Sequence, residues 1–583
     1  MDENRRLDRA AHNGQQGEFD AAIWRRRLAV ALGREPADLI LAGGQVVDVI
    51  GGELLRADIA IADGIIAGVG FYDRAHERID VTGKTVAPSF IDAHVHLESS
   101  LVWAPEFARA VVPRGTGAVV TDPHEIANVA GLDGMEALRT ASHGLPLRVA
   151  FTIPSCVPAS SHESPGTVLD AADIAEALRW PEAVGLGELM DFPGTLAGDD
   201  QIAAKLGVSH GYRRDGHAPG LRGAALQAYA GSGVTSDHES TEIEEAREKL
   251  RAGLMIMIRE GSSEHNLREL LPLVTDHTYP RFCFASDDRD CHTLLHDGHV
   301  DAILRLAIAE GLDPIRAIRM ATWNAADYWR LDGIGAVAPG YRANLVVLDD
   351  LERVRVALTL YNGQVVARDG SLATGVELPA VPVPDRLRQT VRLAPLRLSD
   401  LRLAPAEATT AVEVIPGQIV TRAVAVEPVV VDGWAVAAPG ADLLKLVCAE
   451  RHHATGRVGV GYVRGFGLRR GAIASTIAHD AHNLIAVGAD DADLLAAMAT
   501  VADSDGGLAA VADGRVLAHL PLPIGGILSD RPLAEVAAAY AVLETIARDL
   551  GSTLPSPFGL LAFLALSVIP EARVTDRGFI RVG

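Results

Sequence analysis

The sequence has few cysteines and no long apolar run. Its 583 residues contain four cysteines, and no two have C-x-x-C spacing: Cys156, Cys283, Cys291 and Cys448. This argues against a zinc ribbon and against a disulfide framework, and it fits a reducing compartment. No apolar run reaches the roughly 18 residues of a membrane-spanning helix. The longest candidate, 560–569, is short and ends before a proline.

An apolar leader and an excess of positive charge are also missing. Residues 1–6 are polar and lack the apolar core of a secretory signal, so we expect a soluble cytoplasmic protein. The net charge of −23 argues against nucleic acid or an anionic membrane surface as a partner. The hydrophobic fraction of 48% suits well-buried globular domains, and the length predicts two to four of them.

The two ends of the chain differ in pattern from its middle. Residues 1–36 have apolar residues at roughly helical spacing, which predicts a helical N-terminal extension. Residues 37–84 contain short β runs broken by glycine, typical of a small antiparallel unit, and residues 331–377 are expected to complete it as a small β-sandwich domain. Prolines in 378–384 favour an extended linker. Residues 386–583 are predicted to form a separate C-terminal α/β domain.

In residues 85–330, short β runs alternate with helical stretches, which predicts parallel βαβ units. The clearest helices are 242–252 and 300–310. The predicted strands are the run at His94, then 118–121, 148–152, 183–187, a weaker run before His217, 233–236, 254–258 and 282–285. Eight parallel strands, each followed by a helix, is the count of a TIM (β/α)8 barrel. We therefore expect an α/β protein with a TIM-barrel catalytic domain.

His94 and His96 lie two residues apart on the first predicted barrel strand. Side chains at i and i+2 of a strand point to the same face, so the two imidazoles would project together. Two imidazoles on one face form half of a metal site. The alternative is a pair of buried structural histidines, which would need other polar partners.

Further polar residues lie where the other barrel strands should end, at the face on which TIM-barrel sites are built. In chain order, they are His124, Glu125, Glu188, His217, His238, Glu239 and Asp287. Taken alone, a histidine such as His217 or His238 is more often a hydrogen-bonded structural residue than a ligand. Within this set, however, Glu188, His217, His238 and Asp287 join the two histidines of the first strand and supply four imidazoles and two carboxylates. That is enough for two divalent ions with positions left for water.

These strand-end motifs resemble those of the amidohydrolase superfamily, and within it the bacterial-type adenine deaminases. The segments that carry the resemblance are 90–100, 121–125, 216–220, 236–239 and 285–288. Segments 321–326 and 338–348 are also similar to the superfamily, and 457–483 resembles the adenine deaminases in particular. The resemblance covers nearly the whole chain after residue 36. One departure is Ser89, where the superfamily usually has glycine, and it affects a turn more than the chemistry.

The resemblance implies a metal-dependent hydrolase with two divalent ions. The implied nitrogen ligands are His94, His96, His217 and His238. Glu188 would bridge the ions where many relatives use a carboxylated lysine, and Asp287 would bind one of them. The stretch 184–191 contains no lysine, which supports the assignment of Glu188 as the bridging ligand. Similar deaminases work with manganese or iron, sometimes zinc, and oxygen and imidazole ligands suit all three metals.

The resemblance also implies a reaction, the hydrolytic deamination of adenine to hypoxanthine and ammonia in purine salvage. A metal-activated hydroxide would attack C6, while Asp287 would take its proton and pass it to the departing amine. A further acid must protonate the ring nitrogen beside C6. Our candidate is Glu239, and the alternatives are Glu98, Glu125 and Glu260; each of the four could instead orient a histidine. His124 would be an orienting residue or an additional metal contact.

His479 and His482 lie in the segment that resembles the adenine deaminases. Their i, i+3 spacing brings them together only on a helix. We hypothesise that they face the barrel mouth and help to enclose the base. The alternative is that they are interface residues among glycines in tight β turns.

Two other functions remain open on the sequence. One is a cyclic-amide hydrolase of the same superfamily, similar to dihydroorotase or hydantoinase, although those usually have the strand-four lysine. The other is a catalytically silent metal-binding scaffold, which would not need Asp287. We expect the partner to be a small purine base, adenine. We also expect a homo-oligomer, a dimer, because large chains of this kind often form symmetric assemblies.

Overall fold

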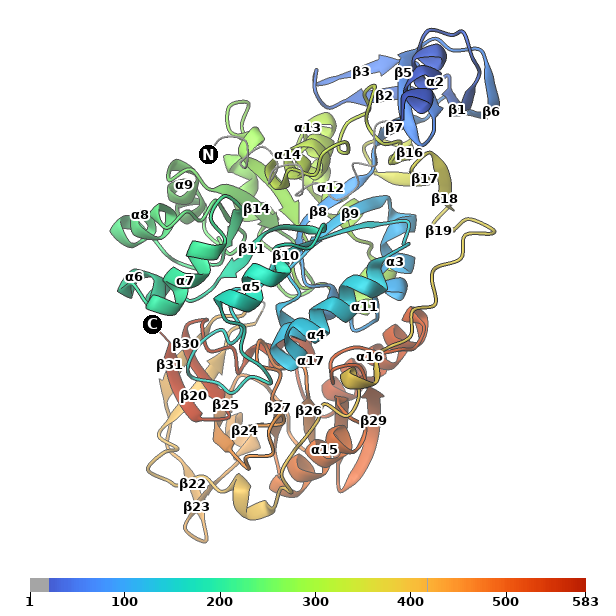
Figure 1. Ribbon diagram of the computed structural model, residues 1–583. Coiled ribbons are helices and arrows are strands. Elements are labelled where there is room, and N and C mark those ends of the chain that lie inside the picture. Colours follow the sequence, from blue (N-terminus) through green and yellow to red (C-terminus); the bar gives the residue numbers. More distant parts are fainter. Residues whose placement is uncertain (1–19, 417, 583) are drawn as a thin grey trace.

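The computed structural model describes residues 20–416 and 418–582 (Figure 1). Residues 1–19 of the predicted N-terminal extension lie outside the described residues. The rest of that extension contains α2 (Ala21–Ala31), which begins after Asp20, whose carboxylate accepts backbone N–H groups of the first turn. In the part of the chain that the structure describes, no helix has the length and apolarity needed to cross a membrane.

Two sheets at one end of the molecule contain the strands that flank the barrel (Figure 1). The first has the order β5 (Ile65–Gly70), β4 (Asp58–Ala62), β1 (Ala37–Ala42), β6 (Ala75–Asp80). The second has the order β19 (Ser371–Leu372), β18 (Gln364–Arg368), β17 (Arg355–Tyr361), β16 (Leu345–Asp350), β7 (Thr85–Pro88), β2 (Gln45–Asp48), β3 (Glu53–Arg56). Strands from before and after the barrel therefore share one sheet, through the antiparallel pair β7 and β16.

The sequence predicts an antiparallel unit, but two strand pairs in these sheets are parallel. The pair β1 and β6 is parallel, and so is the pair β2 and β7. Parallel partners need a long crossover between them. Here the chain between the parallel partners adds strands to the other sheet before it returns. The glycine turns in the sequence look like hairpin turns, so they do not indicate these crossovers.

Eight parallel strands form the middle of the molecule. They are β8 (Phe90–Val95), β9 (Thr116–Thr121), β10 (Arg148–Ile153), β11 (Ala183–Leu189), β12 (Arg213–Gly216), β13 (Ser236–Asp237), β14 (Met255–Arg259) and β15 (Phe282–Ala285). Strands β8 to β12 make one ladder and β13 to β15 another. Backbone hydrogen bonds from Thr235 to Arg214, and from Asp287 to His94, link the two ladders. The arrangement is a TIM-barrel-like ring.

The barrel elements lie where the sequence predicts them, with one shorter strand. At 233–236 only the end of the predicted run is paired, in β13. The predicted helices correspond to α9 (Ile243–Arg251) and α12 (Val300–Ala309). Helix α12 buries Val300, Ile303, Leu304 and Ala307, the i, i+3, i+4, i+7 stripe of a helix that covers a sheet. Both faces of the barrel strands are buried, which explains their nearly continuous apolar runs.

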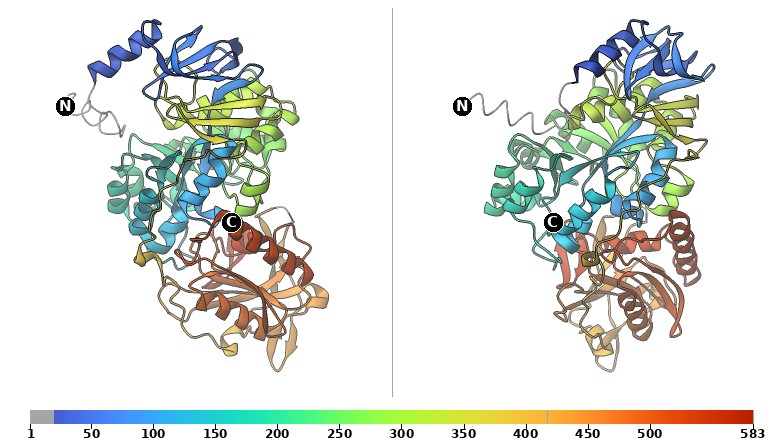
Figure 2. Two further views of the ribbon diagram at one scale, coloured as in Figure 1. Left: turned by 90° about the vertical axis from the view of Figure 1, so that its right-hand side faces the viewer. Right: turned by 45° about the vertical axis from the view of Figure 1, so that its right-hand side comes forward.

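The C-terminal region packs against the opposite end of the barrel from the flanking sheets (Figure 2). Its eight-stranded sheet has the order β21 (Thr421–Ala425), β20 (Thr410–Val414), β25 (Val458–Arg464), β24 (Leu443–Ala449), β27 (Leu484–Gly488), β26 (Ala472–Ser475), β28 (Gly507–Ala512), β29 (Arg515–Pro521). Helices α15 (Asp491–Asp503) and α16 (Leu533–Asp549) pack on this sheet, and α17 (Pro557–Phe563) follows them. One buried apolar cluster contains barrel residues such as Ile126 and C-terminal residues such as Leu561. The two parts therefore share a core.

Candidate metal centre and active site

His94 and His96 leave β8 on the same face, as their spacing predicts. Their Nε2 atoms lie 3.2 Å apart, and they are 3.2 and 3.1 Å from Oε1 of Glu188 at the end of β11. Oδ1 of Asp287, which follows β15, is 3.4 Å from His94 Nε2 and 3.0 Å from His96 Nε2. All four side chains are buried. They form a first group of potential metal ligands.

His217 and His238 form a second group around the other oxygen of Glu188. His217 Nδ1 is 2.5 Å and His238 Nε2 is 3.5 Å from Glu188 Oε2. The Glu188 carboxylate therefore has one oxygen in each group, which is the position of a bridging ligand. The six residues expected as ligands are thus brought together at the carboxyl ends of five different barrel strands.

The spacing of these atoms suits two divalent ions. Ligands about 2.1 Å from one ion lie about 3.0 Å apart in an octahedron and about 3.4 Å apart in a tetrahedron. Among the described residues, two buried atoms of these groups, Glu188 Oε1 and His238 Nε2, have no hydrogen-bond partner. Buried polar atoms are rarely left without a partner. The donor set, imidazole and carboxylate, therefore fits metal ions.

Hydrogen bonds orient the two histidines of β8. His94 Nδ1 lies 2.8 Å from Oδ2 of Asp215, and His96 Nδ1 lies 3.0 Å from the backbone oxygen of Asp122. A proton on Nδ1 leaves the lone pair of Nε2 free to bind a metal. Asp215 is fixed in turn by the Ser236 hydroxyl, which donates to Oδ1 over 2.6 Å. Asp215 had no role predicted from the sequence, although its place two residues before His217 on β12 was an available signal.

Arg259, at the end of β14, lies between two buried carboxylates. Its Nη1 donates to Asp287 Oδ2 over 2.9 Å and also forms a short ion pair with Glu239. Burial alone would raise the pKa of Asp287, but its polar neighbours, among them the positively charged Arg259, hold that pKa well below its usual range. Asp287 is therefore a carboxylate. No sequence pattern indicated Arg259, because one arginine after an apolar run matches no ligand motif.

The four candidate acids have different surroundings. Glu239 and Glu125 line the cavity beside the metal ligands. Glu98 lies outside this lining, where its carboxylate accepts a backbone N–H of α4 (His124–Ser142), and burial together with the charge of Glu125 raises its pKa to about 7. Glu260 also lies outside it and hydrogen-bonds a neighbouring histidine. Position thus separates Glu239 and Glu125 from the other two.

His124 lies between the metal ligands and the C-terminal region. Its Nδ1 is 3.7 Å from Glu188 Oε1, and its Nε2 is 3.2 Å from Glu125 Oε1 and 3.7 Å from Asp480 Oδ1. Nδ1 has no hydrogen-bond partner among the described residues. Both roles predicted for this histidine, orienting residue and additional contact, are compatible with its position.

His479 and His482 reach the barrel from a turn between β26 and β27. His479 Nδ1 is 2.6 Å from Glu125 Oε1, and His482 forms a short contact with Oε2. The expectation that only a helix would bring them together is wrong, because the turn places both rings on one carboxylate. Phe563 stacks on His479 with the ring centroids 4.5 Å apart. The histidines are interface residues, and His479 also lines the cavity.

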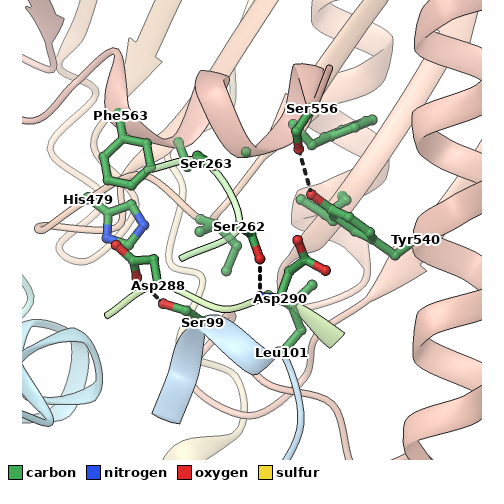
Figure 3. A pocket seen from close by; sticks show the side chains of 15 residues that line it. Ser99, Leu101, Ser262, Ser263, Asp288, Asp290, His479, Tyr540, Ser556 and Phe563 are labelled. Atoms are coloured by element: carbon green, nitrogen blue, oxygen red, sulfur yellow. Dashed lines mark hydrogen bonds between the residues drawn. The ribbon is translucent and has the colours of Figure 1, made fainter. Parts of the chain in front are cut away.

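The cavity beside the metal ligands has walls from both parts of the chain. The C-terminal part contributes Ile419, His479, Asp480, Phe563 and Leu566. A second cavity adjoins it and shares Asp288, His479 and Phe563 with it (Figure 3). Figure 3 shows Asp288 beside Ser99, its hydrogen-bond partner, with Tyr540 and Ser556 across the second cavity. A small molecule at the metal ligands would thus be enclosed by both parts.

Comparisons with known proteins agree with this geometry. The model of the amidohydrolase family matches residues 85–366, and that of the adenine deaminase C-terminal domain matches residues 418–583. An adenine deaminase of Dehalococcoides mccartyi is 45% identical, and one of Methanothrix thermoacetophila is 44% identical. Adenine deaminase 2 of Carboxydothermus hydrogenoformans is 46% identical. Each alignment covers 95% of this chain and 97% of the relative. The resemblance seen in the sequence is confirmed: the chain belongs to the adenine deaminase family and contains an amidohydrolase domain.

Proposed function

We propose that this protein hydrolyses adenine to hypoxanthine and ammonia with the help of two divalent metal ions. The observation that best supports this reaction is the position of the Glu188 carboxylate. One of its oxygens lies beside His94, His96 and Asp287, and the other lies beside His217 and His238. The relatives of nearly equal length, 44–46% identical and named adenine deaminase, support adenine as the substrate.

In this proposal, His94, His96 and Asp287 would hold one ion, His217 and His238 would hold the other, and Glu188 would contribute a carboxylate oxygen to each. Manganese or iron is the proposed metal, with zinc as the alternative, because nitrogen and oxygen ligands without thiolate suit all three. When bound, the ions lower the pKa of water, so that a nucleophile is available near neutral pH.

Asp287 accepts the proton of the attacking water and passes it to the departing amine. It can take this role because its carboxylate group lies beside both histidines of β8, where the attacking water would be held. Arg259 holds its second oxygen and so fixes its orientation. Glu239 remains the proposed acid for the ring nitrogen beside C6, since it lines the same cavity. Its ion pair with Arg259 also supports the alternative role of orienting the site.

The other functions considered from the sequence have less support. A cyclic-amide hydrolase would usually have a lysine at the end of β11, where this chain has Glu188. Residues 418–583 match the C-terminal domain of adenine deaminases, which favours deamination over both a cyclic-amide hydrolase and a silent scaffold.

The organisation of the chain is also a proposal. The domains would be an extension at 1–36, a β-sandwich from 37–84 and 331–377, a barrel at 85–330 and an α/β domain at 386–583. One sheet contains β2 and β3 from the first segment and β16 to β19 from the second, which supports the composite sandwich; β7, which joins them, lies just beyond the proposed boundary at residue 84. The four cysteines are free and buried, which supports a reducing, cytoplasmic location. We propose a homodimer, which light scattering during gel filtration would test.

The test of function is ammonia release from adenine by purified, manganese-loaded protein. Asp287→Asn should abolish release, and Asp73→Asn, the same change at an exposed position, should not. Release that survives Asp287→Asn would contradict the role of Asp287. No release from the wild-type protein with two equivalents of metal bound would refute adenine as the substrate. Dihydroorotate, hydantoins and other aminopurines would then be assayed.

A further inference from the structure

We propose that Glu264 touches the substrate, and that its carboxyl group hydrogen-bonds a ring nitrogen of the purine in the cavity between the barrel and the C-terminal domain. The proposal rests on the proposed function, since it takes the ligand to be a purine base. No motif in the sequence indicated this residue.

Glu264 lies in the short segment between β14 and α10 (Leu267–Leu270). The backbone of this segment is held, because the Gly261 N–H donates to the Glu264 carbonyl over 2.9 Å and Glu260 forms a bridge with His265. The Glu264 side chain is only 5% exposed and lines the same cavity as Glu188 and Asp287. A fixed loop thus presents a buried carboxyl group to the reaction site.

Both carboxyl oxygens of Glu264 have no hydrogen-bond partner among the described residues. A buried carboxyl group without partners is costly, so such groups are almost always hydrogen-bonded. Three other carboxylates of the cavity are already engaged: Glu239 and Asp287 with Arg259, and Glu125 with His479. Glu188 and Asp480 each have one oxygen without a partner among the described residues, whereas Glu264 has two. Glu264 therefore has its full hydrogen-bonding capacity available for a molecule in the cavity.

The protonation state of Glu264 suits a purine ring. Burial raises its pKa to about 8, and the charges of Asp288 and Asp287 add to this effect against the opposing charge of Arg259. A neutral carboxyl group offers one donor and one acceptor. The unprotonated ring nitrogens of adenine are acceptors, and its one ring N–H is a donor. A carboxylate would instead repel the lone pairs of the acceptor nitrogens.

The rest of the cavity suits the flat faces of such a ring. Met190 of the barrel and Ile419, Phe563 and Leu566 of the C-terminal part line it, and all four belong to one buried apolar cluster. An aromatic base packed on these side chains would direct its polar edges toward the carboxyl and imidazole groups of the other walls. This arrangement gives the C-terminal domain a part in holding the base.

Hypoxanthine binding to the manganese-loaded protein, measured by calorimetry, tests the contact without turnover. Glu264→Ala should weaken binding about 10- to 100-fold, because the ring nitrogen loses its buried partner. Glu264→Gln keeps a donor and an acceptor and should change binding less than about threefold. Glu264→Asp withdraws the carboxyl group by one methylene and should weaken binding about tenfold. This variant replaces Glu264→Ala as the test if the alanine variant does not fold. The matched control is Glu269→Ala, at an exposed position of α10.

Deazaadenines, in which one ring nitrogen is replaced by carbon, locate the contact through inhibition constants. With the wild-type protein, one member of the 1-, 3-, 7- and 9-deaza series should bind at least about tenfold more weakly than adenine. That penalty should disappear in Glu264→Ala or Glu264→Asp. Unchanged hypoxanthine binding in both variants, or an analogue series identical to that of the wild type, would overturn the proposal. A wild-type protein that neither binds hypoxanthine nor releases ammonia would instead refute the proposed function.

Discussion

Replacing Asp215 by asparagine should weaken one metal position more than the other. Asp215 Oδ2 accepts from His94 Nδ1 over 2.8 Å, while Oδ1 accepts from the Ser236 hydroxyl over 2.6 Å and the Gly216 N–H over 2.9 Å. In Asp215→Asn, the amide oxygen would stay with the two donors, and the amide nitrogen would face His94. Nδ1 of His94 would then have to accept a hydrogen bond, which moves the ring proton to Nε2, the atom beside Glu188.

The size of the effect follows from what an orienting partner contributes. Loss of such a partner typically lowers metal affinity 10- to 100-fold, or about 1.4 to 2.7 kcal/mol. His94 belongs to the group on Glu188 Oε1, so the ion at that group should carry the loss. His238 Nδ1, on the other group, is 3.8 Å from Asp215 and should be affected less.

Competition with a chromophoric chelator, using zinc as the probe, resolves two binding steps. We expect one step to weaken in Asp215→Asn and the other to stay near its wild-type value. Asp73→Asn, the same substitution at an exposed site, should match the wild type in both steps. Two unchanged affinities, or equal losses in both steps, would refute the reasoning about the His94 tautomer.

Three further predictions concern other residues. His479→Ala should raise the Michaelis constant for adenine several-fold, because a cavity wall held by Glu125 is lost; unchanged turnover and Michaelis constant would contradict the enclosing role. Arg259→Met should lower the free energy of unfolding by about 3 to 5 kcal/mol in urea, because two buried carboxylates lose their cation; a loss below about 1 kcal/mol would contradict this. Burial raises the pKa of Glu544 to about 7, so the folded state keeps a proton that the unfolded chain releases above about pH 4.3. The contribution of Glu544 to the free energy of unfolding should be complete below about pH 4 and lost as pH rises through about 7. If the free energy of unfolding of Glu544→Gln declines from about pH 5 to about 8 as much as that of the wild type, Glu544 is not the cause.

The barrel was predictable because its strands are buried on both faces. Runs such as 118–120 and 254–258 are continuously apolar, and each strand is followed by a helical stretch. The strand at β13 was less predictable, because only two of its residues are paired. The parallel pair β1 and β6 was not predictable, since its partners are set by long crossovers rather than by local sequence.

The strand-end residues were predictable for a topological reason. Parallel strands of a barrel end at one face, so polar residues that follow separate apolar runs must meet there. That rule brings Glu188 and Asp287 to His94 and His96 without any knowledge of side-chain packing. It gives no information about Arg259, whose importance comes from the two carboxylates on either side of it.

The C-terminal wall of the cavity could not be derived from spacing at all. Glu125 and His479 are separated by 354 positions in the chain, yet their side chains are 2.6 Å apart. Glu264 is similar, because its unpaired oxygens become visible only when every neighbour is placed. The metal ligands depend on where strands end, whereas the groups expected to hold the purine depend on how two domains pack. The C-terminal contacts should therefore change the Michaelis constant, while the barrel ligands should control metal content.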